Sequence, residues 1–202
     1  MWLLFGRSFR KNTETVLGRD AGTAKEIKKQ AKNQYKTIIA KLPEFEKDDR
    51  FKMNIVSCAM FAAFYLQMEP KPSLDKITDF YSAAMMTKPM KLFCRISGKN
   101  KFSDKDYKGL RKTEALRAAD RNPYSWNMEL YPFGDGSGYE ARFTKCGICT
   151  LLTELGIPEI TPAMCRLDYT MSEAGGASVF VREYTLASGG PYCDCGYKKK
   201  GR

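Results

Sequence analysis

The residues that could do chemistry are concentrated toward the C-terminal end of this chain. There is no histidine among its 202 residues, which excludes Ser-His-Asp and Cys-His relays, HExxH zinc sites and imidazole proton transfer. Most of the seven cysteines lie late in the chain, namely Cys146, Cys149, Cys165, Cys193 and Cys195. Any catalysis must therefore use cysteine, carboxylate, arginine or tyrosine side chains, or a cofactor.

An aspartate in a predicted helix is the first candidate. In the helix that follows Pro162, an apolar stripe of Met164, Leu167 and Met171 runs beside Asp168 at 100° per residue. We expect Asp168 at the edge of the core, where partial desolvation raises the pKa of a carboxylate and equips it to carry protons. The alternative is that Asp168 caps a helix or pairs with an arginine.

An arginine in a predicted strand is the second candidate. Arg182 shares one face of the strand 178–187 with Phe180, Tyr184 and Leu186. A buried guanidinium needs an anion, either an internal acid or a substrate carboxylate. Simple register across the turn 188–191 places Leu186 opposite Cys193 and Tyr184 opposite Cys195. Both thiols then lie on the Arg182 face and Asp194 on the other, an assignment that one bulge would reverse.

The cysteine pairs also invite a metal hypothesis. Cys146, Cys149, Cys193 and Cys195 could supply four thiolates to a structural zinc ion. However, zinc ribbons repeat CxxC in both halves, whereas the second pair here has one intervening residue on a predicted strand. We therefore expect no metal and no cofactor.

Two kinds of element must position these residues. The region 1–122 is predicted to be mostly helical, with helices at 23–42, 49–67, 73–89 and 103–122, the second apolar nearly all round and so central in the packing. In the region 123–197, strands at 126–133 and 139–145 form a hairpin, helices follow at 147–155 and 161–173, and strands at 178–187 and 192–197 end the region. This order predicts a single α+β domain with a mainly antiparallel sheet, followed by a basic tail, 198–202.

Charge and hydropathy limit the partners. Residues 1–126 hold 26 lysines and arginines against 14 acids, whereas residues 127–197 hold 4 against 9. The basic excess is typical of solvated helix faces, so we expect no nucleic-acid partner. The apolar run 55–66 is too short to cross a bilayer, and Met1–Phe5 is too short for a signal peptide, so we expect no membrane partner, reduced thiols and a cytoplasmic protein. The sequence leaves open whether the protein forms a homo-oligomer.

The C-terminal motifs resemble those of the L-2-amino-thiazoline-4-carboxylic acid hydrolase family. The resemblance covers about residues 124–197, and the helical region matches only in general character. It rests on these segments, in this order: Cys146-Gly-Ile, Glu154-Leu-Gly-Ile-Pro-Glu159, Pro162-Ala-Met-Cys165-Arg-Leu-Asp168-Tyr, Phe180-Val-Arg182-Glu-Tyr-Thr-Leu-Ala-Ser-Gly-Gly190 and Cys193-Asp194. Members typically carry an aromatic residue after the Cys-Asp pair, where this chain has Cys195.

The resemblance implies a hydrolase that opens a small cyclic amidine or thiazoline carboxylate on the route to cysteine. The recurrent residues it carries over are Cys146, Cys165, Asp168, Arg182, Cys193 and Asp194. Water would attack ring carbon C2, with Asp168 or Asp194 as proton carrier and Arg182, together with Cys146, binding the substrate carboxylate. Cys165 or Cys193 could instead attack C2 covalently.

Two rival functions follow from the same residues. A small-molecule-binding or sensor domain would keep the pocket without the chemistry, and it would bind a carboxylate without releasing product. A thiolate zinc module with a basic helical surface would dock on nucleic acid, and it would show bound zinc and a salt-dependent affinity for DNA.

Overall fold

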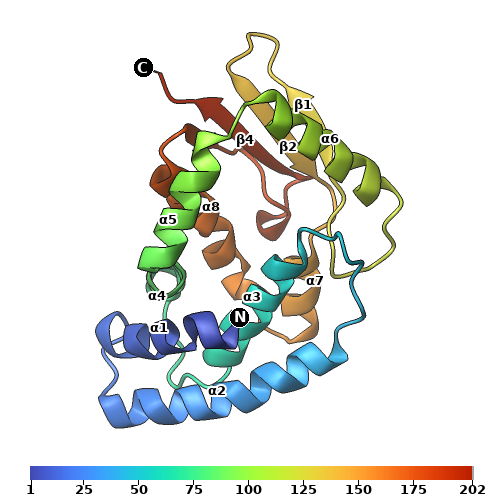
Figure 1. Ribbon diagram of the computed structural model, residues 1–202. Coiled ribbons are helices and arrows are strands. Elements are labelled where there is room, and N and C mark those ends of the chain that lie inside the picture. Colours follow the sequence, from blue (N-terminus) through green and yellow to red (C-terminus); the bar gives the residue numbers. More distant parts are fainter. Residues whose placement is uncertain (202) are drawn as a thin grey trace. The chain divides into compact units, whose positions relative to one another are not determined.

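The computed structural model describes residues 1–201, and Arg202, the last residue of the predicted basic tail, lies outside them. Within this range, eight α-helices precede or interrupt a four-stranded antiparallel sheet, which confirms the α+β class (Figure 1). The chain forms two compact units. The first holds residues 1–87 and 148–166, and the second holds residues 88–147 and 167–202.

The first unit is helical. Its elements are α1 (Trp2–Thr15), α2 (Ala21–Lys41), α3 (Lys52–Tyr65), α4 (Leu74–Met85), α7 (Gly147–Glu154, from Ile148 on), the short helix η1 (Pro158–Ile160) and the first residues of α8 (Thr161–Gly175). Helix α3 is buried on nearly every side, as its sequence predicts. Aromatic rings pack around it, with the Phe61 and Tyr81 centroids 4.4 Å apart and those of Phe9 and Phe64 5.0 Å apart.

Helix caps explain where several predicted helices begin. The Ser73 hydroxyl accepts the backbone N–H of Lys76 at the start of α4, and Ser103 accepts that of Asp106 at the start of α6 (Asp104–Ala118). The helix expected over 161–173 starts without a cap at Thr161, whose residue is already helical and whose hydroxyl donates to the Pro158 carbonyl. Two helices were missed: α1 and α5 (Lys88–Lys99).

Pro89 explains why α5 was missed. The helix expected over 73–89 was to end at this proline, but α4 ends at Met85 and Pro89 lies in the first turn of α5. Proline is favoured at that position because the first helical N–H groups have no partner within the helix.

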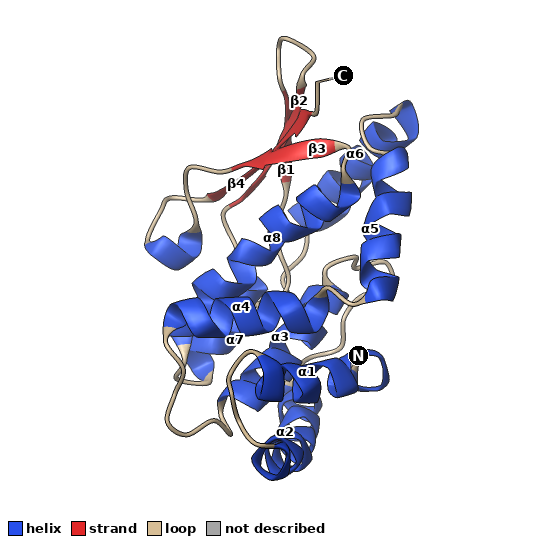
Figure 2. Ribbon diagram, turned by 90° about the vertical axis from the view of Figure 1, so that its left-hand side faces the viewer, coloured by secondary structure: helices blue, strands red, loops and turns tan. Residues whose placement is uncertain are grey.

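The second unit is built on the sheet, which has the strand order β1-β2-β4-β3 (Figure 2). Strands β1 (Glu129–Pro132) and β2 (Gly138–Phe143) form the predicted hairpin, and β4 (Cys193–Lys199) lies between β2 and β3 (Ser178–Val181). Helix α8 covers one face, since the Tyr169 and Phe180 rings are 4.7 Å apart, edge to face. The Ser172 hydroxyl also bonds to Ser178.

The last two strands differ from their predicted lengths. The strand expected over 178–187 ends at Val181 and is followed by an irregular loop and a short helix, η2 (Leu186–Ser188). Val181 pairs with Gly196, so the register is two residues from the one expected. The shift is even, and side-chain faces are therefore unchanged. Of the predicted basic tail, Lys198 and Lys199 belong to β4.

Candidate active site

Asp168, Arg182 and Cys195 meet on one face of the sheet in the second unit. The Arg182 Nη2 donates to Asp168 Oδ2 at 2.6 Å and to Cys195 Sγ at 2.8 Å. Asp168 comes from α8, Arg182 from the first position after β3, and Cys195 from the middle of β4. An internal acid thus neutralises the arginine, which is one of the two alternatives left open by the sequence.

The two charged partners differ in exposure. The Arg182 side chain is 6% exposed and its guanidinium carbon lies 4.6 Å from the centre of the Phe180 ring, whereas the Asp168 side chain is 40% exposed. The apolar row that was expected to surround Arg182 ends here, because Tyr184 lies in the loop and is exposed. The pair therefore consists of a covered cation and a half-buried carboxylate.

Burial and pairing shift the pKa values of both partners. Desolvation raises the pKa of Asp168 above its ordinary value, an effect that the charge and hydrogen bond of Arg182 oppose. Burial alone would lower the pKa of the Arg182 guanidinium, but Asp168 and Cys195 outweigh it and the pKa is raised. Arg182 therefore stays charged at every accessible pH, while Asp168 is the member of the pair that can exchange a proton.

The thiols on this face stay protonated near neutral pH. Burial raises the pKa of Cys195 and of Cys193, and the nearby Cys146 contributes to the shift at Cys193. Both residues are 8% exposed. The Cys193 Sγ also accepts the backbone N–H of Leu186 at 3.2 Å, so it holds the loop after β3.

Asp194 lies on the opposite face of β4, as the alternation of the strand predicts. Its two carboxylate oxygens accept the backbone N–H groups of Glu183 and Tyr184 at 2.7 and 2.6 Å. The backbone pairing of β3 with β4 ends at Val181, and Asp194 accepts these two N–H groups in place of β4 carbonyl groups. Asp194 thus fixes the loop that carries Arg182.

The remaining predicted residues are not all brought into this cluster. Cys146 lies in the second unit and interacts electrostatically with Cys193. Cys165 lies in the first unit, one helical turn before Asp168 along α8, and Cys149 lies in the first unit on α7. Across residues 1–201, no group of three or more cysteine or acidic side chains is arranged to hold a metal ion.

Tyr197 is the residue of the cluster that the sequence did not single out. Cys195 was expected on the Arg182 face but was given no role, because related sequences carry an aromatic residue there; it contacts Arg182. Tyr197 follows on the same face, and burial together with Asp168 and Cys195 raises the pKa of its hydroxyl well above the ordinary value. Alternation along β4 was the signal that could have found Tyr197, since it is two residues from Cys195.

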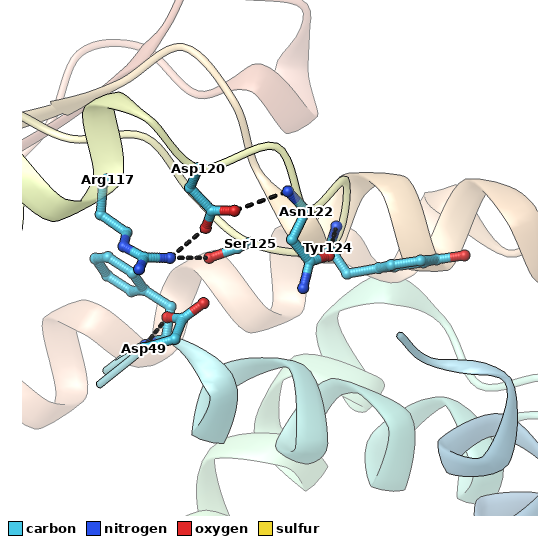
Figure 3. A network of polar contacts seen from close by, with 7 residues as sticks. Asp49, Arg117, Asp120, Asn122, Tyr124 and Ser125 are labelled. Carbon is cyan, nitrogen blue, oxygen red and sulfur yellow. Dashed lines mark hydrogen bonds and ion pairs between the residues drawn. The ribbon is translucent and has the colours of Figure 1, made fainter. Parts of the chain in front are cut away.

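A second buried ion pair lies elsewhere in the same unit (Figure 3). Arg117, near the end of α6, bonds to Asp120 and donates to the Ser125 hydroxyl at 3.2 Å. Asp120 in turn accepts the backbone N–H of Asn122 at 2.7 Å, and the Asn122 side chain accepts that of Tyr124 at 2.9 Å. The network fixes the turn that leads from α6 to β1. The expectation that the basic helices expose their charges is wrong for Arg117, which is 2% exposed.

Comparison with protein families gives a match. The family model described as L-2-amino-thiazoline-4-carboxylic acid hydrolase matches residues 53–197. The chain belongs to this family. No curated protein and no solved structure matches significantly.

The family match is longer than the resemblance seen in the sequence. It begins at residue 53, within α3, and so includes α3–α6 as well as the motifs after residue 124. The part of the helical region from residue 53 on therefore belongs to the family's domain, and its resemblance is more than general character, whereas α1 and α2 lie outside the matched range. All six residues that the motifs singled out fall inside the matched range.

Proposed function

We propose that this member of the family opens a small cyclic amidine carboxylate, aminothiazoline carboxylate or a close analogue, by adding water to ring carbon C2. The observation that carries the proposal is the half-exposed carboxylate of Asp168, held by a covered arginine on the sheet face that also carries Cys195. A carboxylate with a raised pKa and one open side can take a proton from water and return it to a leaving atom.

The reaction balances with water as the only co-substrate. Asp168 accepts a proton as the water oxygen bonds to C2, which gives a tetrahedral carbon. The C–S or the C–N ring bond then breaks, and the proton returns to the departing sulfur or nitrogen. The product is a carbamoyl-cysteine in either case, with the carbamoyl group on nitrogen if C–S breaks and on sulfur if C–N breaks.

We assign Arg182 a positioning role. Its guanidinium is covered and already bonded to Asp168, which supports orientation of that carboxylate in preference to capture of the substrate's carboxylate. Asp194 and Cys193 fix the loop after β3 through backbone N–H groups, and so hold Arg182 in place. Both are positioning residues under this proposal.

The covalent cysteine route has less support. A thiol must ionise to attack C2, and burial raises the pKa of Cys193 away from the neutral range. Arg182 opposes that shift but does not reverse it. We therefore favour water attack assisted by Asp168. No disulfide joins the cysteines of the described residues, and we propose a reducing, cytoplasmic setting for the protein.

The decisive experiment is a turnover assay with purified protein and aminothiazoline carboxylate, followed by mass spectrometry of the carbamoyl-cysteine formed. Asp168→Asn should lower kcat by about 10²–10⁴-fold, the usual contribution of a general acid–base group. Glu173→Gln, the same chemical change at an exposed position of α8, should leave kcat unchanged.

Two outcomes would contradict the proposal. Full activity of Asp168→Asn would remove Asp168 from the mechanism. Stoichiometric binding of the carboxylate with no product after long incubation would favour a binding or sensor domain. Circular dichroism and the Tm of both variants separate lost chemistry from lost folding.

A further inference from the structure

Helix α5 carries an apolar row that no part of the described chain covers. At 100° per residue, Leu92, Ile96 and Phe93 fall within one quarter-turn or so of each other. Their side chains are 57%, 54% and 59% exposed, respectively. Single exposed apolar residues are normal on a protein surface, but three large ones in a row on one helix mark an interaction surface.

A row of cations runs beside the apolar row. Lys88, Lys91, Arg95 and Lys99 follow the i, i+3, i+4 spacing of one helix face, and all four are exposed. Helix α5 contains no acidic residue. Within residues 1–201, no acidic side chain forms an ion pair with any of the four cations, whose charge is thus available to a partner.

The third side of α5 fixes its orientation. Cys94 is buried, and Gly98 packs so closely on α8 that a Cβ there would lie 2.6 Å from the Gly175 carbonyl oxygen. Both views of the second unit show α5 running along its side next to α8 (Figures 1 and 2). The helix cannot roll to bury its apolar row without breaking this contact, so the two rows face outward together.

We infer that α5 is a docking surface for an anionic lipid bilayer. In an exposed helix of this kind, the apolar row can contact the acyl chains of a bilayer while the parallel row of cations contacts its phosphate headgroups. Charge decides the occupant. A second copy of this chain would bring cations against cations, and the chain as a whole carries a net charge of +11, which repels a copy and attracts an anionic surface.

This inference revises the expectation of no membrane partner. No helix of the described residues is long and apolar enough to cross a membrane. Contact through α5 alone places the helix in the plane of the headgroups, with Leu92, Phe93 and Ile96 as the inserted side chains. A single short helix gives reversible attachment.

Co-sedimentation of the full-length protein with vesicles tests the inference. Vesicles of equal parts phosphatidylglycerol and phosphatidylcholine should bind the protein, and pure phosphatidylcholine vesicles should not. Lys91→Glu/Arg95→Glu should weaken binding by about 25-fold or more, since each of the two lost cations contributes about fivefold near an anionic surface. Lys32→Glu/Lys36→Glu on α2 is the matched control: it makes the same charge change at the same spacing and should weaken binding much less.

The apolar row needs its own variant. Leu92→Ser/Phe93→Ser leaves every charge in place and should reduce binding as strongly as the charge reversal. Equal loss in the α2 control and the α5 variant would overturn the inference, as would equal binding to both kinds of vesicle. If light scattering showed a dimer, and if Lys91→Glu/Arg95→Glu converted it to a monomer, α5 would be assigned to contact with a second copy instead. Tm values of all variants verify that they fold.

Discussion

The two buried arginine–aspartate pairs of the second unit differ in what they leave open. Arg117 and Asp120 are both sealed, with side chains 1% and 6% exposed, and they lie three residues apart in sequence. Arg182 is equally covered at 6%, but its partner Asp168 is 40% exposed. The first pair is closed on both sides, whereas the second presents one oxygen-bearing group outward.

The difference in exposure gives the two ion pairs different possible roles. A sealed pair satisfies its own charges and can do little except fix the chain around it, as the bonds to Ser125 and Asn122 indicate. A half-open pair keeps one ionisable group where a ligand can reach it, while its covered cation orients that group. The chain therefore uses the same two residue types in one place to fix a turn and in another to hold a carboxylate that remains partly exposed.

Removal of the sealed cation should have the largest effect on stability. We expect Arg117→Met to lower the free energy of unfolding by about 3–5 kcal/mol, because Asp120 is left as a buried charge without its guanidinium. Urea denaturation followed by circular dichroism gives the value. Arg117→Met/Asp120→Asn should recover part of the loss, since the neutral amide can still accept the Asn122 N–H. No recovery would mean that Arg117 acts through packing and not through charge.

Removal of the half-open pair's cation should cost less. Arg182→Met leaves Asp168 with an exposed side through which water can hydrate it, so we expect a loss of about 1–2 kcal/mol, mainly that of a charged hydrogen bond. The same urea experiment compares the two variants directly. Equal losses for Arg117→Met and Arg182→Met would erase the distinction between a sealed pair and an open one.

The sequence singled out both members of the open pair, although not their bond to each other, because each of them disturbs a pattern. Arg182 interrupts a row of apolar residues in a strand, and Asp168 sits beside an apolar stripe in a helix. Arg117 disturbs no apolar row, because the residues one turn before it on α6 are Thr113 and Glu114, and Asp120 and Ser125, which it contacts, lie beyond the helix. A charged residue can thus be recognised as buried only where the surrounding residues are apolar in the sequence itself.

The fold shows the same limit. Helix α3, which is apolar nearly all round, was predicted close to its bounds, and the capping Ser73 gave the start of α4 but not its end. The end of β3 at Val181 was not, because the N–H groups of Glu183 and Tyr184 find their acceptor in Asp194, ten residues or more away. Helix α5 was missed because its apolar row is exposed and Pro89 was taken as a stop signal.

The Cys195 thiol beside Arg182 gives a last prediction, with a smaller expected effect, on which group neutralises the guanidinium. If Asp168 neutralises it, Cys195 stays protonated, and the pKa of Cys195 in the folded chain lies above the ordinary 9.0. The unfolded chain then releases the thiol proton at a lower pH than the folded chain, so stability falls as pH rises above about 9. The difference in unfolding free energy between wild type and Cys195→Ala should fall by about 1 kcal/mol from pH 9 to pH 10.

The opposite sign would overturn this view of the site. A thiolate paired with Arg182 would have a folded-state pKa below 9.0. The wild type would then gain stability over Cys195→Ala as the pH rises from that folded-state pKa to the unfolded-state value of 9.0. Such a thiolate would also react rapidly with iodoacetamide at neutral pH, which peptide mapping would detect at Cys195. A protonated, slowly alkylated Cys195 leaves the charge of Arg182 to Asp168 alone, which is the arrangement that keeps this carboxylate oriented toward its open side.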